Sequence, residues 1–308
     1  MRFITTADLK RRRNWIDEIA KLGQRFNDDS LRLEGELKTE IKKEGTAALV
    51  GHLRMAGDIP EVYGHDTSEE KQYSKYTDAL LSEAFKAIGL KSTVLTERAD
   101  AADVEAFGKD FSLVADAKAF RISRTAKNAE DFKVASMHGW KKGKDFAIVV
   151  CPLHQLPTKA SQIYQQASAS NVCLMTYAHL SVIVRYADLA GKSAAETLLR
   201  AVLDCIKTLK ATKDSVAYWT CLNQTMLGFN KRVHDLWEEE QQAAIEAVVV
   251  AKDEATAFLA KEETRIRNLS HKDAIADLLR MHKIDKRVGV VKNIASNNLL
   301  EFGRPAAQ

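Results

Sequence analysis

The sequence predicts an α/β protein of the α+β type, with a mixed sheet core flanked by extensive helical regions. Short segments rich in Val, Leu, Phe and Thr follow one another between residues 91 and 120, as strands do. The run from Asp145 to Cys151 is almost entirely apolar, which is typical of a central strand buried on both faces. Segments in which apolar residues recur at helical spacing fill the chain on either side of these strands. Helices that pack on a sheet bury the apolar faces of both the helices and the sheet.

This order of patterns predicts three successive parts of one compact subunit. We expect an N-terminal helical region at residues 1–90, an α/β core at 91–190 and a C-terminal helical region at 191–308. A chain of 308 residues buries a sizeable core without disulfides.

Four helices are expected in the N-terminal region. Thr6 is the expected cap of the first helix, whose apolar residues recur at roughly helical spacing as far as Leu22. Pro60 and two glycines predict a loop before the fourth helix, which is capped within 66–69 and ended by Gly89. The expected helices cover residues 6–22, 31–43, 47–55 and 66–88.

Three consecutive arginines, Arg11, Arg12 and Arg13, lie within the first expected helix. Such a run is usually a solvated helix face, which is the interpretation preferred here. Contact with nucleic-acid phosphates is the alternative.

The spacing of apolar residues changes from helical to strand-like at Lys91, and the elements expected after this residue are read from the new pattern. Strands are predicted over the segments STVLTE, DVEAF and FSLVADAKAF, and again over 145–151 and 172–177. Helices are expected over 159–169, 179–189, 194–210 and 233–266.

Composition narrows the function classes. A formal net charge of +4 permits a nucleic-acid partner without requiring one. The four cysteines are scattered without metal-ligand spacing, and His138, His154 and His179 show none either, so a zinc site is not indicated. The first residues lack the apolar core of a signal peptide and no apolar run is long enough to span a bilayer, so we expect a cytoplasmic protein without a membrane partner.

A β-hairpin is predicted with its turn at Lys109 and Asp110. Paired residue numbers then sum to 219, which places Asp103 directly across from Asp116. Strand alternation puts Glu105, Asp116 and Lys118 on the same face as Asp103, while apolar residues occupy the other face.

Two facing carboxylates repel one another and favour a bound cation. Oxygen ligands without His or Cys favour Mg²⁺, with Mn²⁺ as a substitute, and the carbonyl of Ala117 is a further candidate ligand. Lys118 is placed to orient a water and to stabilise charge on a phosphate, so Asp103, Asp116 and Lys118 are the candidate catalytic residues. The alternative is an ordinary salt-bridged hairpin. Glu97 and Glu105 are possible assisting carboxylates.

The segment after the hairpin is dense in groups that contact DNA. Basic residues recur every three positions from Lys118 and are interleaved with Ser, Thr and Asn, which suits phosphate neutralisation and contacts to base edges. Asp131 follows Asn128 by three residues and is expected in a capping box that opens the helix toward Trp140. A solvated basic loop is the alternative for this segment. The candidate DNA-binding residues are Arg121, Ser123, Arg124, Thr125, Lys127, Asn128 and Lys133.

The stretch LVADAKAFRISRTAKNAEDFKV, from Leu113 to Val134, resembles HindIII-like type II restriction endonucleases, as do Asp145 to Pro152 and Ser161-Gln162-Ile163. The resemblance implies a restriction-endonuclease-like fold, a homodimer, and Mg²⁺-dependent cleavage of double-stranded DNA at a palindrome, which in this family is AAGCTT. It places Asp103, Asp116 and Lys118 on the catalytic motif and the segment from Arg121 to Lys133 on the DNA-reading region. The Pro-Asp usual in this wider fold is Ala102-Asp103 here, a change that spares the ligand oxygens.

Two other functions are considered beside a restriction endonuclease. One is a nuclease of the same fold that acts in DNA repair or on mobile DNA. The other is a noncatalytic helical DNA-binding protein in which the acidic pair only forms ion pairs with Lys118.

Overall fold

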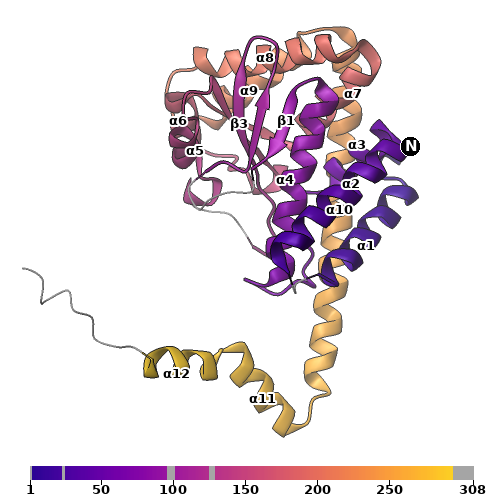
Figure 1. The fold of residues 1–308 in the computed structure, drawn as a ribbon, viewed down its shortest axis with the longest axis vertical. Helices are drawn as coiled ribbons and strands as arrows, with labels where there is room; N and C mark the ends of the chain where they lie inside the picture. The colour runs from indigo at the N-terminus through magenta and orange to yellow at the C-terminus, as the bar shows by residue number, and fades with distance from the viewer. Residues whose placement is uncertain (1, 23–24, 96–100, 125–128, 294–308) are drawn as a thin grey trace, which may run out of the picture. The chain divides into compact units, whose positions relative to one another are not determined.

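A computed structural model describes residues 2–22, 25–95, 101–124 and 129–293 of the chain (Figure 1). The chain divides into two compact units, Met1–Thr256 and Ala257–Gln308. The larger unit contains the sheet and the candidate site. No helix among the described residues is long and apolar enough to cross a membrane.

Four helices precede the sheet: α1 Thr6–Ala20, α2 Phe26–Glu44, α3 Thr46–Met55 and α4 Ser68–Ile88. The N-cap of α1 is Thr5 rather than the expected Thr6, and it forms a capping box with Asp8. Thr67 caps α4, and Gly89 ends it with φ 119°, a conformation that Gly adopts without strain.

The expected solvated face at Arg11 and Arg12 is wrong for both residues. Arg11 forms ion pairs with Asp8, Glu40 and Glu44 at 2.7–2.9 Å. Arg12 is buried and bonds to Glu254 at 2.8 Å and to the carbonyl oxygen of Met55 at 2.8 Å. The sequence pattern of α1 alone could not show that acidic residues from distant helices meet this face.

Five strands form one sheet in the order β1-β2-β3-β4-β5: Lys91–Val94, Val104–Phe107, Ser112–Ala117, Phe146–Cys151 and Val172–Thr176. Strand β1 pairs antiparallel with β2 and β2 with β3, whereas β3 pairs parallel with β4 and β4 with β5, so the sheet is mixed as predicted. Every residue of β4 is buried, which confirms the central strand. Val104 pairs with Ala115 and Phe107 with Ser112, which confirms the predicted hairpin register.

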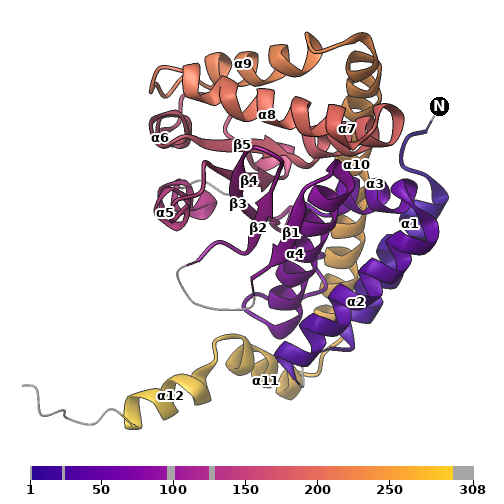
Figure 2. The same cartoon turned by 45° about the horizontal axis from the view of Figure 1, so that its top comes forward.

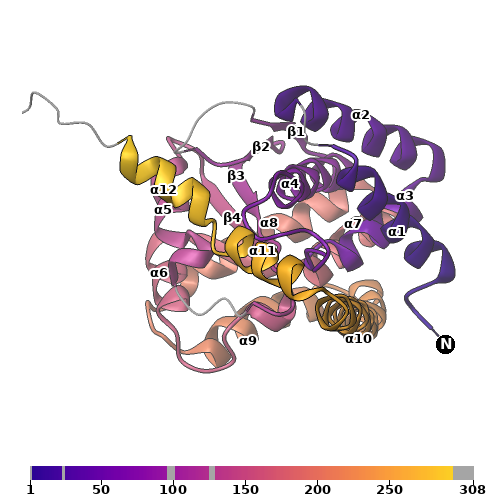
Figure 3. The ribbon, with the colours of Figure 1, turned by 90° about the horizontal axis from the view of Figure 1, so that it is seen from below.

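Helices cover this sheet on two sides (Figure 2). Helix α4 packs across β1, β2 and β3 and contacts two later helices, α7 and α8 (Figure 3). Helices α5 and α6 pack against each other, α5 against β3, β4 and β5, and α6 against β5. The bounds of the later helices are Val134–Trp140 (α5), Gln162–Ser170 (α6), Tyr177–Ala190 (α7), Lys192–Thr208 (α8), Ser215–Leu227 (α9) and Lys231–Arg267 (α10).

Among the boundaries that differ from the sequence expectations, two bear on the candidate site residues. Strand β3 ends at Ala117, so Lys118 follows the strand instead of continuing it. Helix α5 begins only at Val134, with Lys133 as its N-cap residue in the left-handed conformation, and Asp131 lies before it in a short 3-10 helix, η1 Ala129–Phe132. Asn128, its expected capping partner, lies outside the described residues. The smaller unit contains α11 His271–Met281 and α12 Ile284–Lys292.

Candidate metal centre

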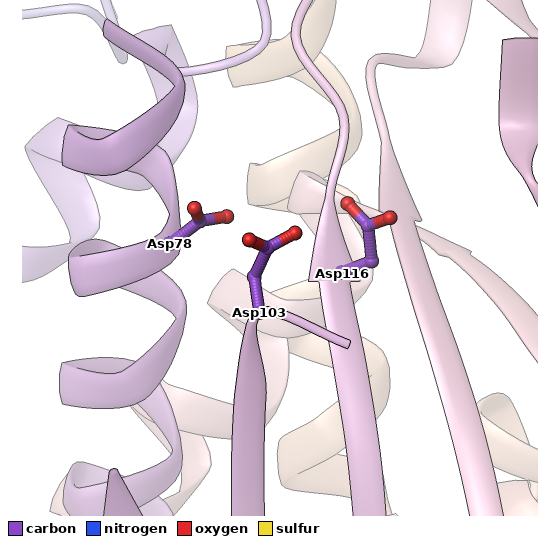
Figure 4. A group of neighbouring side chains, drawn as sticks. All are labelled: Asp78, Asp103 and Asp116. Carbon is purple, nitrogen blue, oxygen red and sulfur yellow. The ribbon is translucent and has the colours of Figure 1, made fainter. Parts of the chain in front are cut away.

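Three carboxylates converge at the open end of the β2–β3 hairpin (Figure 4). Asp103 directly precedes β2, Asp116 lies near the end of β3, and Asp78 projects from α4 toward both of them. Each side chain offers one ligand atom, and these atoms all lie within 4.8 Å of one another. The predicted Asp103–Asp116 pair is therefore brought together, and a third acid joins it.

The backbone around each aspartate explains its position. Asp116 is held between two neighbouring strands, because β3 pairs with β2 on one side and Asp116 pairs with Val149 of β4 on the other. The carbonyl oxygen of Asp103 accepts a bond of 2.8 Å from the N–H of Leu95, which extends the β1–β2 ladder to this residue. Asp78 is positioned by the packing of α4 across the sheet.

Asp78 was not among the residues expected at the site. It lies in α4 between Tyr76 and Leu80, two large side chains with apolar surface. All three residues are buried. An acidic residue within such a stretch is the available signal, but only helix-to-sheet packing shows which carboxylates it meets.

Two lysines neutralise part of the negative charge. The Nζ atom of Lys118 lies 2.6 Å from Oδ2 of Asp116. The Nζ atom of Lys75, one turn before Asp78 on α4, lies 3.0 Å from Oδ1 of Asp103 and 3.2 Å from Oδ2 of Asp78. Three carboxylates thus face two ammonium groups, which leaves one negative charge when all five groups are ionised.

Burial makes this arrangement costly without a further cation. It raises the pKa of Asp78 well above its ordinary value, and the charge of Asp103 raises it further. Burial also raises the pKa of Asp116, although Lys118 opposes that effect. For Lys75, burial acts to lower the pKa, but Asp78 and Asp103 outweigh it and raise the pKa. Protonation and metal binding are the two ways to relieve the repulsion.

The donor set fits a hard divalent cation. All three ligand groups are carboxylates from three different elements, and no His or Cys is among them. Oxygen donors of this kind suit Mg²⁺, Mn²⁺ or Ca²⁺ rather than zinc in a Cys or His site. Ala117, whose carbonyl was expected as a ligand, directly follows Asp116 at the end of β3.

Two of the expected DNA-binding residues, Arg121 and Ser123, form hydrogen bonds to other parts of the same chain. Arg121 is buried, with its guanidinium 3.1 Å from Glu70 and donating to the carbonyl oxygen of Gly64 at 2.6 Å. Ser123 donates from both its backbone N–H and its hydroxyl to Glu61, at 3.0 and 2.9 Å. Both residues tie the segment after β3 to the loop between α3 and α4.

The other expected DNA-binding residues are placed differently. The Arg124 side chain is 51% exposed and forms one ion pair with Asp131 at 3.1 Å. Lys133 is exposed and its Nζ atom lies 5.4 Å from the ring centroid of Trp140. Its charge opposes the rise that burial causes in the pKa of Asp116. Thr125, Lys127 and Asn128 lie outside the described residues.

Of the two possible assisting carboxylates, the structure describes Glu105, which pairs with a lysine. Glu105 lies 3.1 Å from Lys144, which precedes β4. Glu97 lies outside the described residues.

Known proteins were compared with the whole chain. The model of the family described as HindIII restriction endonuclease matches residues 13–295. The chain belongs to this family. Over 287 residues it is 31% identical to the type II restriction enzyme HindIII of Haemophilus influenzae, an alignment that covers 89% of this chain and 94% of that enzyme.

Family membership confirms the resemblance read from Leu113 to Val134 and the restriction-endonuclease-like fold. The match also includes most of the helical regions on either side of the sheet. The chain is therefore a nuclease of the type II restriction endonuclease class that acts on DNA.

Proposed function

We propose that this enzyme cleaves both strands of a palindromic DNA site by phosphodiester hydrolysis that depends on Mg²⁺, with Mn²⁺ as a substitute. The observation that carries the proposal is the cluster of Asp78, Asp103 and Asp116 beside Lys118. A carboxylate cluster with an adjacent lysine is suited to hydrolysis of a phosphodiester, since the reaction needs both a cation and a positioned proton donor or acceptor.

The three aspartates and the lysine have different roles in this proposal. Asp78, Asp103 and Asp116 would hold the ion, with the carbonyl of Ala117 as a further ligand. A bound divalent ion supplies Lewis-acid stabilisation of the negative charge that grows on the phosphate. Lys118, whose Nζ atom lies beside Asp116, orients the attacking water and donates to the phosphate oxygens.

The segment after β3 brings DNA to this centre. Arg124 and Lys133 are exposed on the chain that follows β3 and would contact phosphates or bases, together with Thr125, Lys127 and Asn128. Arg121 and Ser123 support that surface, because their contacts with Gly64 and Glu61 fasten the segment to the α3–α4 loop. A palindromic target requires two such centres related by a two-fold axis, hence a homodimer.

The named relative is a type II restriction enzyme, and this chain is similar to it along nearly its whole length. The resemblance around Leu113–Val134 extends the proposal to the target AAGCTT. A nuclease of this family with another target, or with a role in repair, differs in the ends that it leaves. Sequencing the termini of digested plasmid reports activity, target and overhang together.

A substitution of Asp116 tests the centre. Asp116→Asn preserves the shape of a buried side chain and removes its charge, so the protein should fold and bind DNA but lose plasmid cleavage in Mg²⁺. The matched control is Asp145→Asn, which removes a carboxylate that bonds to Ser112 in the same sheet, away from the cluster. Cleavage at the wild-type rate by Asp116→Asn would refute the assignment.

A further inference from the structure

A turn after β3 is held by a side chain that comes from beyond β4. The turn runs from Arg121 to Arg124 and is closed by a bond of 3.0 Å from the N–H of Arg124 to the carbonyl oxygen of Arg121. Gln155 ends the short 3-10 helix η2 Leu153–Gln155 that follows β4. Its Nε2 atom donates to the carbonyl oxygen of Arg124 at 2.7 Å and lies 3.5 Å from that of Arg121. The amide group therefore reaches both ends of the turn.

Gln155 is an unusual choice for its position, since the residue is only 5% exposed. A buried amide is costly unless it forms hydrogen bonds, and an apolar side chain of similar length would fill the same space. The amide NH₂ group offers two N–H donors, and backbone carbonyl groups outside helices and strands need donors. The carbonyl groups of the turn therefore explain why a glutamine, rather than a methionine, suits this position.

The two arginines of the turn point to different surroundings. Arg121 is buried and bonds to Gly64 and Glu70, so it anchors the turn to the protein. The Arg124 side chain is 51% exposed. Because Gln155 bonds to the carbonyl group of Arg124 itself, this bond fixes the backbone from which the exposed guanidinium extends.

The end of β4 also positions the candidate catalytic lysine. Strand β3 pairs with β4 as far as Ala117 and Val150, and the carbonyl oxygen of Val150 accepts the backbone N–H of Lys118 at 2.7 Å. Gln155 follows Val150 closely in the chain. One short stretch therefore fixes both the backbone of Lys118 and the turn that presents Arg124.

We propose that Gln155 is a positioning residue for DNA recognition. Its amide sets the shape of the turn Arg121–Arg124 and thereby the place of the Arg124 guanidinium relative to the end of β4. Gln155 acts through the backbone of the turn and does not itself contact DNA. The proposal rests on the proposed function, because it takes Arg124 as a DNA contact.

Removing the amide tests this role. Gln155→Met keeps an unbranched side chain of similar length but has no donor. The measurement is the ratio of kcat/KM on the target, as read from the sequenced ends of cleaved DNA, to kcat/KM on a site with one changed base pair. This ratio should fall roughly 10-fold, since a misplaced arginine loses a base-edge contact. Mn²⁺ binding should be unchanged, because Gln155 is not in the carboxylate cluster.

Gln155→Glu is a second variant with nearly the same shape. Its ionised carboxylate only accepts hydrogen bonds, so it cannot bond to the two carbonyl oxygens of the turn. The added negative charge weakens binding to target and changed site alike, and this uniform effect cancels in the ratio. The ratio should fall for this variant as well.

Gln72→Met is the matched control. Gln72 is also buried, and its Nε2 donates to the carbonyl oxygen of Phe26 at 3.0 Å, at the start of α2. Gln72→Met and Gln155→Met should both lower the unfolding temperature, because each leaves a backbone carbonyl group without a donor. Only Gln155→Met should change the ratio.

A double variant shows whether Gln155 acts through Arg124. Arg124→Ala removes the side chain that the turn presents. Adding Gln155→Met to it should alter the ratio by less than ~2-fold, since two residues that act as a unit do not have additive effects.

Four results would overturn the proposal. The first is a wild-type ratio in both Gln155 variants. The second is an equal loss of the ratio in Gln72→Met, which would make the role of Gln155 structural only. The third is a full further loss when Gln155→Met is added to Arg124→Ala, because the two residues would then act independently. The fourth is a wild-type enzyme that cuts DNA without preference for any site, which contradicts the proposed function itself and leaves Gln155 no recognition to support.

Discussion

The Nζ atom of Lys75 lies 3.0 Å from Oδ1 of Asp103, so α4 supplies the carboxylate cluster with a cation as well as with Asp78. A bound divalent ion would perform the same neutralisation. Lys75 and the metal ion would therefore stabilise the same two carboxylates, Asp78 and Asp103, and the effect of removing one cation depends on the presence of the other.

Replacing Lys75 with Met should destabilise the metal-free protein by about 1–2 kcal/mol, because a partly buried ion pair is broken. In millimolar Mg²⁺ the loss should shrink, since the metal then balances Asp78 and Asp103. Urea denaturation with and without Mg²⁺ measures both values. Lys71→Met is the control, because Lys71 and its partner Asp66 are both exposed, so the substitution should change stability by less than ~0.5 kcal/mol. An equal loss in both conditions for Lys75→Met would argue against metal binding at this cluster.

Asp78→Asn should weaken Mn²⁺ binding at least ~10-fold and strongly reduce cleavage, because a charged ligand becomes neutral. The metal-free variant should be as stable as the wild type or more stable, since burial already disfavours the charged form of Asp78 and raises its pKa. Calorimetric titration with Mn²⁺ and thermal unfolding provide the measurements. Glu105→Gln is the control. It alters a carboxylate of the β2–β3 hairpin that pairs with Lys144, and the variant should bind Mn²⁺ normally. If the two variants bind Mn²⁺ equally well, Asp78 is not a ligand.

Arg121 should contribute to the stability of the protein, and Arg124 to its affinity for DNA. Arg124→Ala removes an exposed cation, so DNA affinity should fall and the slope of log affinity against log salt should decrease by about 1, without loss of stability. Arg121→Ala removes a buried guanidinium that pairs with Glu70, so it should lower the unfolding temperature. Fluorescence anisotropy at several salt concentrations and thermal unfolding separate the two effects. A stable Arg121→Ala protein with a reduced salt slope would instead make Arg121 a direct phosphate contact.

Arg12 and Arg13 are adjacent in sequence but should respond very differently to substitution. Arg12→Met removes the donor to Glu254 and one of the donors to the carbonyl oxygens of Met55 and Asp58, and it leaves a partly buried carboxylate contact unpaired, so we expect a loss of about 3–5 kcal/mol in the free energy of unfolding. Arg13 is exposed, and Arg13→Met should stay within ~0.5 kcal/mol of the wild type. Denaturant titration tests both. If both substitutions have similarly small effects on stability, Arg12 is solvated, as the sequence predicts, and not buried.

Stability should fall in acid because of His179. Burial lowers the pKa of this imidazole to about 4, while its Nδ1 accepts the N–H of Thr176 and its Nε2 bonds to Asn223. The unfolded chain takes up a proton near pH 6.5, so the stability that is present above that pH is lost as the pH falls toward 4. Between pH 7 and pH 5 this loss should be on the order of 2 kcal/mol.

The His179→Gln variant should lose correspondingly less stability between pH 7 and pH 5, as measured by denaturant titration at both values. His234→Gln, at an exposed position of α10, should keep the wild-type pH dependence. If His179→Gln also keeps it, another group causes the acid sensitivity.

The sequence by itself determined the hairpin and its register, because side chains alternate along strands and a turn at Lys109 and Asp110 pairs residues that sum to 219. It also determined the buried strand β4 and the family, because a continuous apolar run and a stretch of characteristic residues can both be read directly along the chain. These features depend on residues that are close in sequence.

Only the tertiary structure decided which distant groups meet. Asp78 and Lys75 reach the hairpin because α4 packs across the sheet, and Arg12 is buried because Glu254, 242 residues later, closes over it. Such contacts depend on how whole helices pack, and helical periodicity determines which face of a helix is buried but not what it is buried against.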